Sequence, residues 1–404
     1  MSRFYYSIWV LLAFWGVNGA HAQSQQDAQP TPTPAAHAPT EPEIVQLPSA
    51  VTTDYPALNT IHFEWYAPQN VGVTGKAPAI IALHALGGDI NVPRGFARYF
   101  AKRGIGTAVI ELPYHFHRAL PGVGPASRYL SSNADEAALT WKQAYSDVST
   151  VLTWLESRTE VDTTRFGAVG ISLGAVTIHG VMGQDPRLKA AVTFVGGGDF
   201  PYIYEHSVIS RIALHSDHQI TAEDSAILRQ IDPIAFASAN RPRRVLMIQS
   251  ARDIVIPPHS SQELWKALGR PPIRWLDFGH FGVNLALKQA HSATLSFLQS
   301  AWTDAEEHGN DASRLRAPKI WAPVVKAGIL SGLDSNLTPA LTVQVASFGT
   351  RPDHLAWVHA DVGITGRGPY VGIAASINSF IDIGYGRRLG GDKFRPYVGT
   401  QIAF

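Results

Sequence analysis

The sequence predicts an α/β domain built on a doubly wound sheet, followed by a smaller all-β unit whose strands form an antiparallel meander. Short apolar runs recur along residues 59–301 and alternate with helical patterns. Runs that are this short and apolar on both faces are typical of parallel strands covered by helices. After about residue 316, apolar and polar residues instead alternate strictly, which indicates strands with one buried face.

Composition and charge limit the classes of function. The chain has 404 residues, which is enough for two or three domains. Its 33 basic and 32 acidic side chains nearly cancel and form no basic run, so nothing favours a nucleic-acid partner. The chain contains no cysteine, which excludes disulfides, thiolate metal ligands and a cysteine nucleophile.

The N-terminal segment predicts export. Arg3 precedes an apolar stretch, and Ala20 and Ala22 are the small residues that a signal peptidase recognises, so residues 1–22 are a predicted signal peptide. The apolar stretch is too short for a membrane anchor. We therefore expect a bacterial protein of the periplasm, the outer membrane or the extracellular space. Residues 23–48, rich in Gln, Pro, Thr and Ala, predict an extended linker.

The elements of the α/β domain, residues 49–303, follow from the same patterns. The clearest helix covers 134–158, where apolar residues recur at steps of three and four. Residues 60–65 predict a leading antiparallel strand. Residues 200–240 fit the alternation poorly and predict a cap inserted above the sheet. The predicted parallel strands are 79–84, 107–110, 166–169, 190–195, 245–248 and 273–276.

The C-terminal β unit, residues 317–404, is predicted to contain about six strands separated by turns. Its last strand carries Val398, Thr400, Ile402 and Phe404 on one face and resembles the closing strand of bacterial outer-membrane barrels. The apolar faces predict either outer-membrane association, or oligomerisation, or packing on the first domain. Six strands are fewer than the smallest single-chain membrane barrels have, so closure is expected to need an oligomer. Of these alternatives, soluble packing on the first domain is slightly favoured.

The strongest chemical signal is Gly170-Ile171-Ser172-Leu173-Gly174. It follows the predicted strand 166–169 and precedes a helix-compatible stretch. A serine at so tight a turn from strand to helix stands exposed above the sheet, at a helix N-terminus that favours negative charge. The glycines at 170 and 174 allow the turn to pack, so Ser172 is the predicted nucleophile.

A serine hydroxyl needs a base to take its proton and an acid to orient that base. His280 follows the last predicted strand, and Asp253 follows the strand before it. These places agree with the chain order nucleophile, acid, base, so His280 is the predicted base and Asp253 the predicted acid. Asp199 is the serious rival acid, whereas Asp277 precedes the base by only three residues.

Two backbone N–H groups are expected to stabilise an oxyanion. One belongs to Leu173, which follows the nucleophile, and the other to the loop 84–88 after the first parallel strand. In that loop the donor is Ala85 or Leu86, and Leu86 is preferred. His84 is expected to brace the loop.

Two groups of histidines are considered as ligands of a metal ion. His115 and His117 follow a strand end, and His215 and His218 lie in the predicted cap. Neither group has a convincing ligand set, so no metal is predicted.

The stretch Asp162 to Gly174 resembles the nucleophile strand of the α/β-hydrolase superfamily, on its dienelactone-hydrolase and prolyl-oligopeptidase-like side. Arg252-Asp253 and Gly279-His280 are similar to the blocks of that group. The resemblance covers about residues 59–301 and implies hydrolysis through an acyl-enzyme without a cofactor. A dienelactone hydrolase carries cysteine where this chain has Ser172, so ester or amide substrates fit better.

A carboxylic ester of a small molecule or polymer is the expected substrate, and residues 113–129 are expected to line the acyl pocket. One alternative is a serine peptidase or amidase. The other is a non-catalytic cell-envelope protein with a C-terminal outer-membrane anchor. The Ser, Asp and His residues stand in the order that an enzyme needs, which favours an enzyme.

Overall fold

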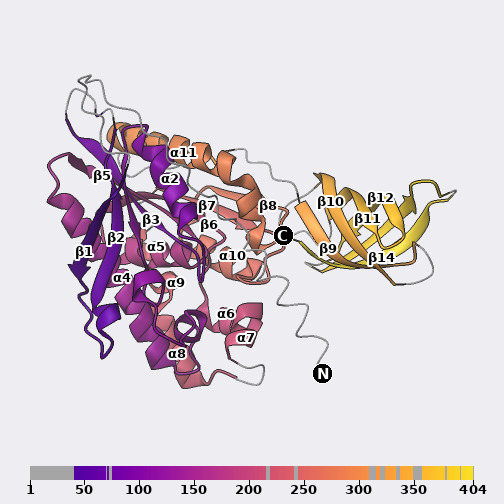
Figure 1. The fold of residues 1–404 in the computed structure, drawn as a ribbon, viewed down its shortest axis with the longest axis horizontal. Coiled ribbons are helices and arrows are strands. Elements are labelled where there is room, and N and C mark those ends of the chain that lie inside the picture. The colour runs from indigo at the N-terminus through magenta and orange to yellow at the C-terminus, as the bar shows by residue number, and fades with distance from the viewer. Residues whose placement is uncertain are drawn as a thin grey trace, which may run out of the picture. The chain divides into compact units, whose positions relative to one another are not determined.

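The computed structural model (Figure 1) describes residues 41–69, 71, 75–214, 219–240, 244–308, 315–318, 324–333, 337–348, 357–377, 380–391 and 393–403. The predicted signal peptide and the predicted linker up to residue 40 lie outside this part of the chain. The described residues form an α/β domain and a β-barrel.

An eight-stranded sheet forms the centre of the α/β domain, in the order β1-β2-β4-β3-β5-β6-β7-β8. β1 and β2 lead as antiparallel strands, and the strands from β4 to β8 pair in parallel. The doubly wound sheet is therefore confirmed. The strands are β1 (Glu43–Pro48), β2 (Thr60–Tyr66), β3 (Ala77–Leu83), β4 (Gly106–Ile110), β5 (Val161–Ile171), β6 (Leu188–Phe194), β7 (Arg244–Ser250) and β8 (Ile273–Leu276).

The sheet begins earlier than the predicted domain boundary at residue 49. Residues that were assigned to the linker form β1, which pairs with β2 from Glu43 opposite Trp65 to Pro48 opposite Thr60. β1 is an edge strand, and four of its six residues are exposed. Pro48 is compatible with such a strand because an edge strand needs fewer backbone donors. The strand was assigned to the linker because the preceding residues are rich in proline.

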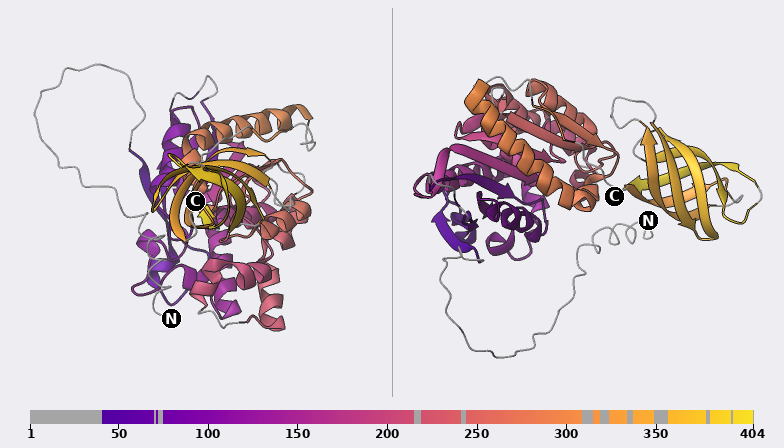
Figure 2. Two further views of the ribbon diagram at one scale, coloured as in Figure 1. Left: turned by 90° about the vertical axis from the view of Figure 1, so that its right-hand side faces the viewer. Right: turned by 90° about the horizontal axis from the view of Figure 1, so that it is seen from above.

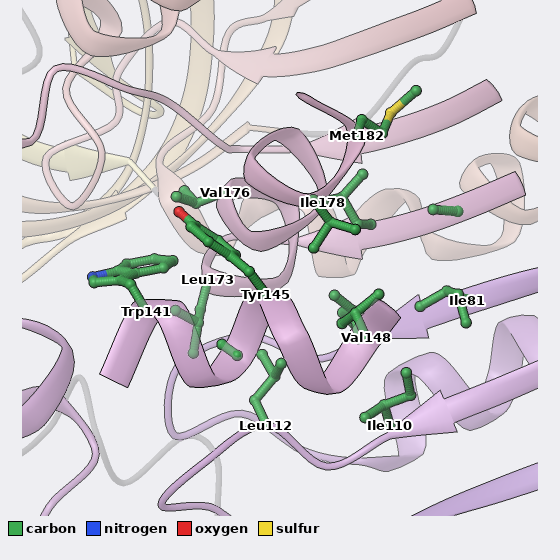
Figure 3. Close-up of a cluster of buried hydrophobic side chains, with 14 of the residues drawn as sticks. Ile81, Ile110, Leu112, Trp141, Tyr145, Val148, Leu173, Val176, Ile178 and Met182 are labelled. Carbon is green, nitrogen blue, oxygen red and sulfur yellow. The ribbon is translucent and has the colours of Figure 1, made fainter. Parts of the chain in front are cut away.

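Helices cover both faces of the sheet. One core cluster packs α4, α5 and α10 against the sheet, and another packs α2 and α11 against its opposite face. In Figure 3, Tyr145 of α4 points toward Val176 of α5, and Val148 of α4 lies on the side of the strand residues Ile81 and Ile110. The helices are α2 (Asn91–Ala101), α3 (Ala126–Tyr129), α4 (Ala134–Glu156), α5 (Leu173–Gln184), α6 (Phe200–His206), α7 (Val208–Ala213), α8 (Ala222–Ile231), α9 (Pro233–Asn240), α10 (Pro258–Ala267) and α11 (Leu287–His308).

Three short 3-10 helices join these elements, η1 (Pro56–Asn59), η2 (Phe116–Arg118) and η3 (His280–Ala286). The predicted cap corresponds to α6–α9, which lie between β6 and β7 in the chain. The last helix, α11, extends to His308 and so passes the predicted domain end at 303. In the described part of the chain, no helix has the length and hydrophobicity that crossing a membrane requires.

The C-terminal strands close into a six-stranded antiparallel barrel in the order β10-β11-β12-β13-β14-β9, visible end-on in the left view of Figure 2. This confirms the predicted β-rich unit. Phe404 lies outside the described residues. The strands are β9 (Val324–Ser331), β10 (Thr338–Phe348), β11 (Trp357–Thr365), β12 (Gly368–Ser376), β13 (Ile381–Arg388) and β14 (Arg395–Ala403).

Closure within a single chain corrects the expectation that it would need an oligomer. Several inward positions are glycines, which keeps the interior narrow. A Cβ added to Gly363 would lie 2.6 Å from the Leu341 carbonyl oxygen, and one added to Gly384 would lie 2.6 Å from that of Ile373. Both carbonyls belong to the strand that pairs with the strand of the glycine, so glycine at these positions lets neighbouring strands pack as closely as a narrow barrel requires.

The barrel interior contains a charged cluster and, beside it, a small apolar cluster whose members are Leu330, Leu333, Ala340, Tyr370, Ala374 and Tyr397. Lys326, His359, Asp361 and Asp382 are each at most 1% exposed. The Lys326 Nζ lies 2.8 Å from one carboxylate oxygen of Asp361 and 2.8 Å from one of Asp382, and the His359 Nδ1 lies 3.0 Å from the other oxygen of Asp361. The histidine and the two carboxylates have the donors of a metal site. The Lys326 ammonium already pairs with both carboxylates, so it takes the place of a cation there.

The outer face of the barrel, which we call the wall, is apolar. On every strand from β9 to β14, apolar side chains that point outward are substantially exposed. Among the described outward positions the charged side chain is Arg387, next to the end of β13. The large exposed wall residues are Ile329, Leu341, Val343, Val345, Val358, Val362, Ile364, Ile373, Ile383, Tyr385 and Val398.

Candidate active site

Ser172 lies at the turn between β5 and α5, with backbone angles φ 54° and ψ −113°. These angles are strained for a residue with a side chain, and the packing around the turn imposes them. A Cβ on Gly170 would lie 2.5 Å from the Gly174 carbonyl, and a Cβ on Gly174 would lie 2.7 Å from the Leu83 Cβ. Glycine at both positions therefore allows the strand, the turn and the helix to pack this closely.

The structure brings Ser172, His280 and Asp253 together although they are far apart in the sequence. The Ser172 Oγ lies 2.9 Å from the His280 Nε2, and the His280 Nδ1 lies 2.7 Å from the Asp253 Oδ2. All three side chains are buried. The other Asp253 oxygen, Oδ1, accepts the N–H groups of Val255 and Ile256, each at 2.8 Å. These two bonds hold the carboxylate in the orientation that the imidazole needs.

The two rival acids have other neighbours. An Asp199 carboxylate oxygen lies 3.9 Å from the His259 Nε2. Asp277 accepts the Arg252 Nε–H at 2.6 Å. Arg252 also donates to Asp382, at 3.4 Å, and to Gln344, at 3.2 Å, both in the barrel. Arg252 and Asp277, neighbours in sequence of the acid and the base, thus belong to a buried ion-pair network.

Two backbone N–H groups beside Ser172 are available to an oxyanion. Within the described residues, neither the Leu173 N–H nor the Leu86 N–H donates a hydrogen bond. Both residues line the same cavity as Ser172. Gly87 has a φ of +60°, a left-handed conformation that glycine adopts without strain, so the loop turns directly after Leu86.

Two buried histidines brace this loop. The Leu112 N–H donates to the His84 Nε2 at 3.0 Å, and the Gly87 N–H donates to the His115 Nε2 at 3.0 Å. The opposite ring nitrogens donate to the carbonyls of Ala85 and Pro113. Burial lowers the pKa of both histidines, that of His115 to about 4. A neutral ring with an acceptor nitrogen is what each loop contact requires.

Of the other histidines considered from the sequence as metal ligands, His117 lies in the described part of the chain. His117 pairs through its Nδ1 with Glu111 at 2.8 Å. His215 and His218 lie outside the described residues. From the sequence, His115 was considered as a metal ligand, which missed that it accepts the Gly87 N–H of the loop. Its position after a strand end was the sequence signal for such a role.

A small cavity of about 60 Å³ opens beside Ser172. Its wall is almost entirely aliphatic and aromatic. Of the predicted segment 113–129, only Tyr129 contributes, while α4, α6, α7 and the residues after β7 supply most of the wall. The lining residues are Leu86, Tyr129, Leu130, Trp141, Ser172, Leu173, Val176, Phe200, Ile203, Tyr204, Ser207, Ile209, Val255 and Ile256.

Comparison with known sequences agrees with this site. The sequence profile of the prolyl oligopeptidase family matches residues 131–281, a segment that contains Ser172, Asp253 and His280. An uncharacterized protein of Mycobacterium tuberculosis is 26% identical over 214 residues, 51% of this chain and 63% of that protein. The chain therefore spans less than two thirds of this relative.

Comparison with solved structures shows the fold. The acetyl xylan esterase from Paenibacillus sp. R4 is 20% identical, with a TM-score of 0.50 over 65% of this chain and 89% of the esterase. A puromycin hydrolase is 19% identical, with a TM-score of 0.50 over 65% of this chain and 39% of that enzyme. The chain therefore shares the α/β-hydrolase fold with both structures, and its central segment is similar to the prolyl oligopeptidase family.

Proposed function

We propose that this chain is an exported serine hydrolase that cleaves carboxylic esters with an apolar acyl group through an acyl-enzyme. One observation carries the proposal: the hydrogen-bonded series Ser172–His280–Asp253 ends at a closely lined apolar cavity. Such a cavity suits the acyl part of an ester, since it offers large apolar contact and few polar groups.

The proposed mechanism follows from the hydrogen bonds. The His280 Nε2 takes the Ser172 proton as the oxygen attacks the carbonyl carbon, while Asp253 holds the imidazole through its Nδ1–H. The N–H groups of Leu173 and Leu86 donate to the oxyanion. The His280 proton passes to the leaving alcohol, and water then attacks the acyl-enzyme with His280 again as the base.

An ester is favoured over a peptide by the chemistry of the cavity. An extended peptide is bound largely through its backbone N–H and C=O groups. The cavity residues beside Ser172 are chiefly Leu, Ile, Val, Phe and Trp, and the hydroxyl side chains among the others are those of Tyr129, Tyr204 and Ser207, so few groups are present to satisfy a peptide backbone. The Trp141 indole N–H already donates to the Tyr129 carbonyl at 3.2 Å.

The experiment compares nitrophenyl esters with nitroanilides that carry the same acyl groups, from acetyl to octanoyl. We expect kcat/KM to rise with acyl length and to be larger for each ester than for its amide. A larger rate enhancement over the uncatalysed reaction for the amides than for the matched esters would indicate a peptidase or amidase instead.

Fluorophosphonate labelling tests the nucleophile. Ser172→Ala is expected to abolish both labelling and turnover, because a lost nucleophile reduces kcat by orders of magnitude. Ser260→Ala is a matched control, since Ser260 is fully buried and its hydroxyl has no hydrogen-bond partner in the described structure. Wild-type labelling in Ser172→Ala would refute the assignment, and absence of labelling in the wild type would favour a non-catalytic envelope protein. N-terminal sequencing of the mature protein tests export, with Gln23 as the expected first residue.

A further inference from the structure

We propose that the wall of the β9–β14 barrel lies in the hydrocarbon of a lipid bilayer. The barrel has the polarity of a membrane barrel, with apolar side chains outside and charged ones inside. Ile373 is 60% exposed on the wall, whereas Lys326 and Asp361 are fully buried or nearly so in the interior. In a water-soluble barrel the hydrophobic effect would favour the opposite arrangement.

The apolar surface continues around the whole barrel. The six strands close on themselves, and each of them contributes exposed apolar residues to the wall. A second copy of the chain, or another protein, would cover one side and leave the other in water. Lipid surrounds a barrel on all sides, and it alone covers a surface that has no edge.

The backbone and the interior are also suited to lipid. Every strand pairs with two neighbours, so the closed barrel presents no unpaired edge to hydrocarbon. Each buried carboxylate has a cationic partner: Lys326 lies 2.8 Å from both Asp361 and Asp382, and Arg252 of the α/β domain lies 3.4 Å from Asp382. The Ser376 hydroxyl donates to Asp382 at 2.6 Å. These polar groups find their partners within the barrel and need no water outside it.

Strand length and end charges fit a bilayer as well. The strands contain 8 to 11 residues, and about 9–11 tilted residues cross the hydrocarbon. The turn 366–367 lies at the same end as the C-terminal end of β13 and the first residue of β14, because Tyr370 pairs with Arg388 and Gly386 with Arg395. This end carries Arg367, Arg387, Arg388, Lys393 and Arg395. Such a basic end complements the anionic headgroups of a membrane surface.

The test uses the full chain, purified in detergent and diluted into vesicles of phosphatidylcholine and phosphatidylglycerol. Val343 of β10 and Ile383 of β13 are mid-wall residues, and their strands are three apart in both directions around the barrel. The variants Val343→Arg and Ile383→Arg therefore place a charge on opposite sides. Leu139→Arg, at a half-exposed position on α4 of the α/β domain, is the matched control.

We expect the wild type and Leu139→Arg to float with the vesicles after a urea wash. Each wall variant should lower the folded, membrane-bound population about 30- to 900-fold, the usual effect of arginine near the bilayer midplane. Ester hydrolysis in detergent checks that the α/β domain of every variant is folded. This readout also separates failure of the membrane proposal from failure of the proposed function.

Two results would overturn the proposal. One is a wild-type chain that stays monodisperse without detergent and does not float. The other is sensitivity to only one of the two wall variants, together with a dimer in lipid-free buffer, which would assign that side to a second copy.

Discussion

His115 provides a stringent test of how the proposed oxyanion loop is held. Its ring is 3% exposed, and its Nε2 accepts the Gly87 N–H at 3.0 Å. His115→Phe keeps a ring of similar size and removes that acceptor. Gly87 directly follows Leu86, the proposed donor, so a loop that loses this bond is free to move the Leu86 N–H away from the oxyanion.

The size of the effect follows from the lost bond. A buried N–H left without a partner lowers the free energy of unfolding by about 1–3 kcal/mol. Loss of one oxyanion donor typically lowers kcat about 100- to 1000-fold. Because His115→Phe displaces the donor and does not delete it, we expect a fall in kcat of about 10- to 100-fold with little change in KM.

The measurement is steady-state hydrolysis of a nitrophenyl ester, together with urea unfolding. His117→Phe is the control, since its side chain is 71% exposed and pairs with Glu111 outside the loop. The reasoning is refuted if His115→Phe unfolds at the wild-type urea concentration and keeps kcat within twofold of wild type.

The pH dependence measures the burial of the same ring. Burial lowers the pKa of His115 from 6.5 to about 4, so the neutral ring stabilises the fold above pH 6.5. Below pH 6.5 the unfolded chain binds the proton first, and stability falls until the pH reaches about 4. That interval corresponds to about 3 kcal/mol. His115→Phe should lack this contribution, so its unfolding free energy should fall less than that of wild type between pH 7 and pH 4.

Four further variants test the site and the barrel. Asp253→Asn is expected to lower kcat about 10⁴-fold and Asp199→Asn to leave it near wild type, and the reverse result would make Asp199 the acid. Ile203→Trp should fill part of the cavity and lower the octanoyl-to-acetyl ratio of kcat/KM about tenfold or more, whereas an unchanged ratio would place the acyl group elsewhere. Lys326→Met leaves two buried carboxylates without their ammonium and should destabilise the barrel by about 3–5 kcal/mol in thermal unfolding. A change below about 1 kcal/mol would contradict that role.

The sequence predicts the catalytic geometry well because its signals are local. Ser172 is flanked by glycines between a strand and a helix, and His280 and Asp253 each follow a strand end. The carboxyl ends of neighbouring parallel strands meet at one edge of a sheet. Once the strands are predicted correctly, the residues that follow them are expected at one place. The same three side chains are indeed within hydrogen-bonding distance in the structure.

The cavity was much less predictable. Its wall combines Trp141 of α4, Ile203 of α6, Ile209 of α7 and Val255 after β7, which are dispersed over more than a hundred residues. No local pattern distinguishes an apolar residue that lines a cavity from one that fills a core, since both are buried and apolar. The packing of α6 and α7 decides which of these residues line the cavity. Both helices lie in the cap, where the sequence pattern was weakest.

The barrel shows why alternation alone misleads. Val358, Val362 and Ile364 lie on one face of β11, and we expected that face to be the covered one. Instead it is exposed, and His359 and Asp361 point inward. Alternation divides a strand into two faces but does not say which one is inside. Which face is inside depends on whether the strands close into a barrel. Closure in turn depends on inward glycines such as Gly363, whose role is visible only when the neighbouring strands are known. Charged residues at inward positions of β9, β11 and β13 pair with one another, and the membrane proposal rests on this polarity together with the apolar wall.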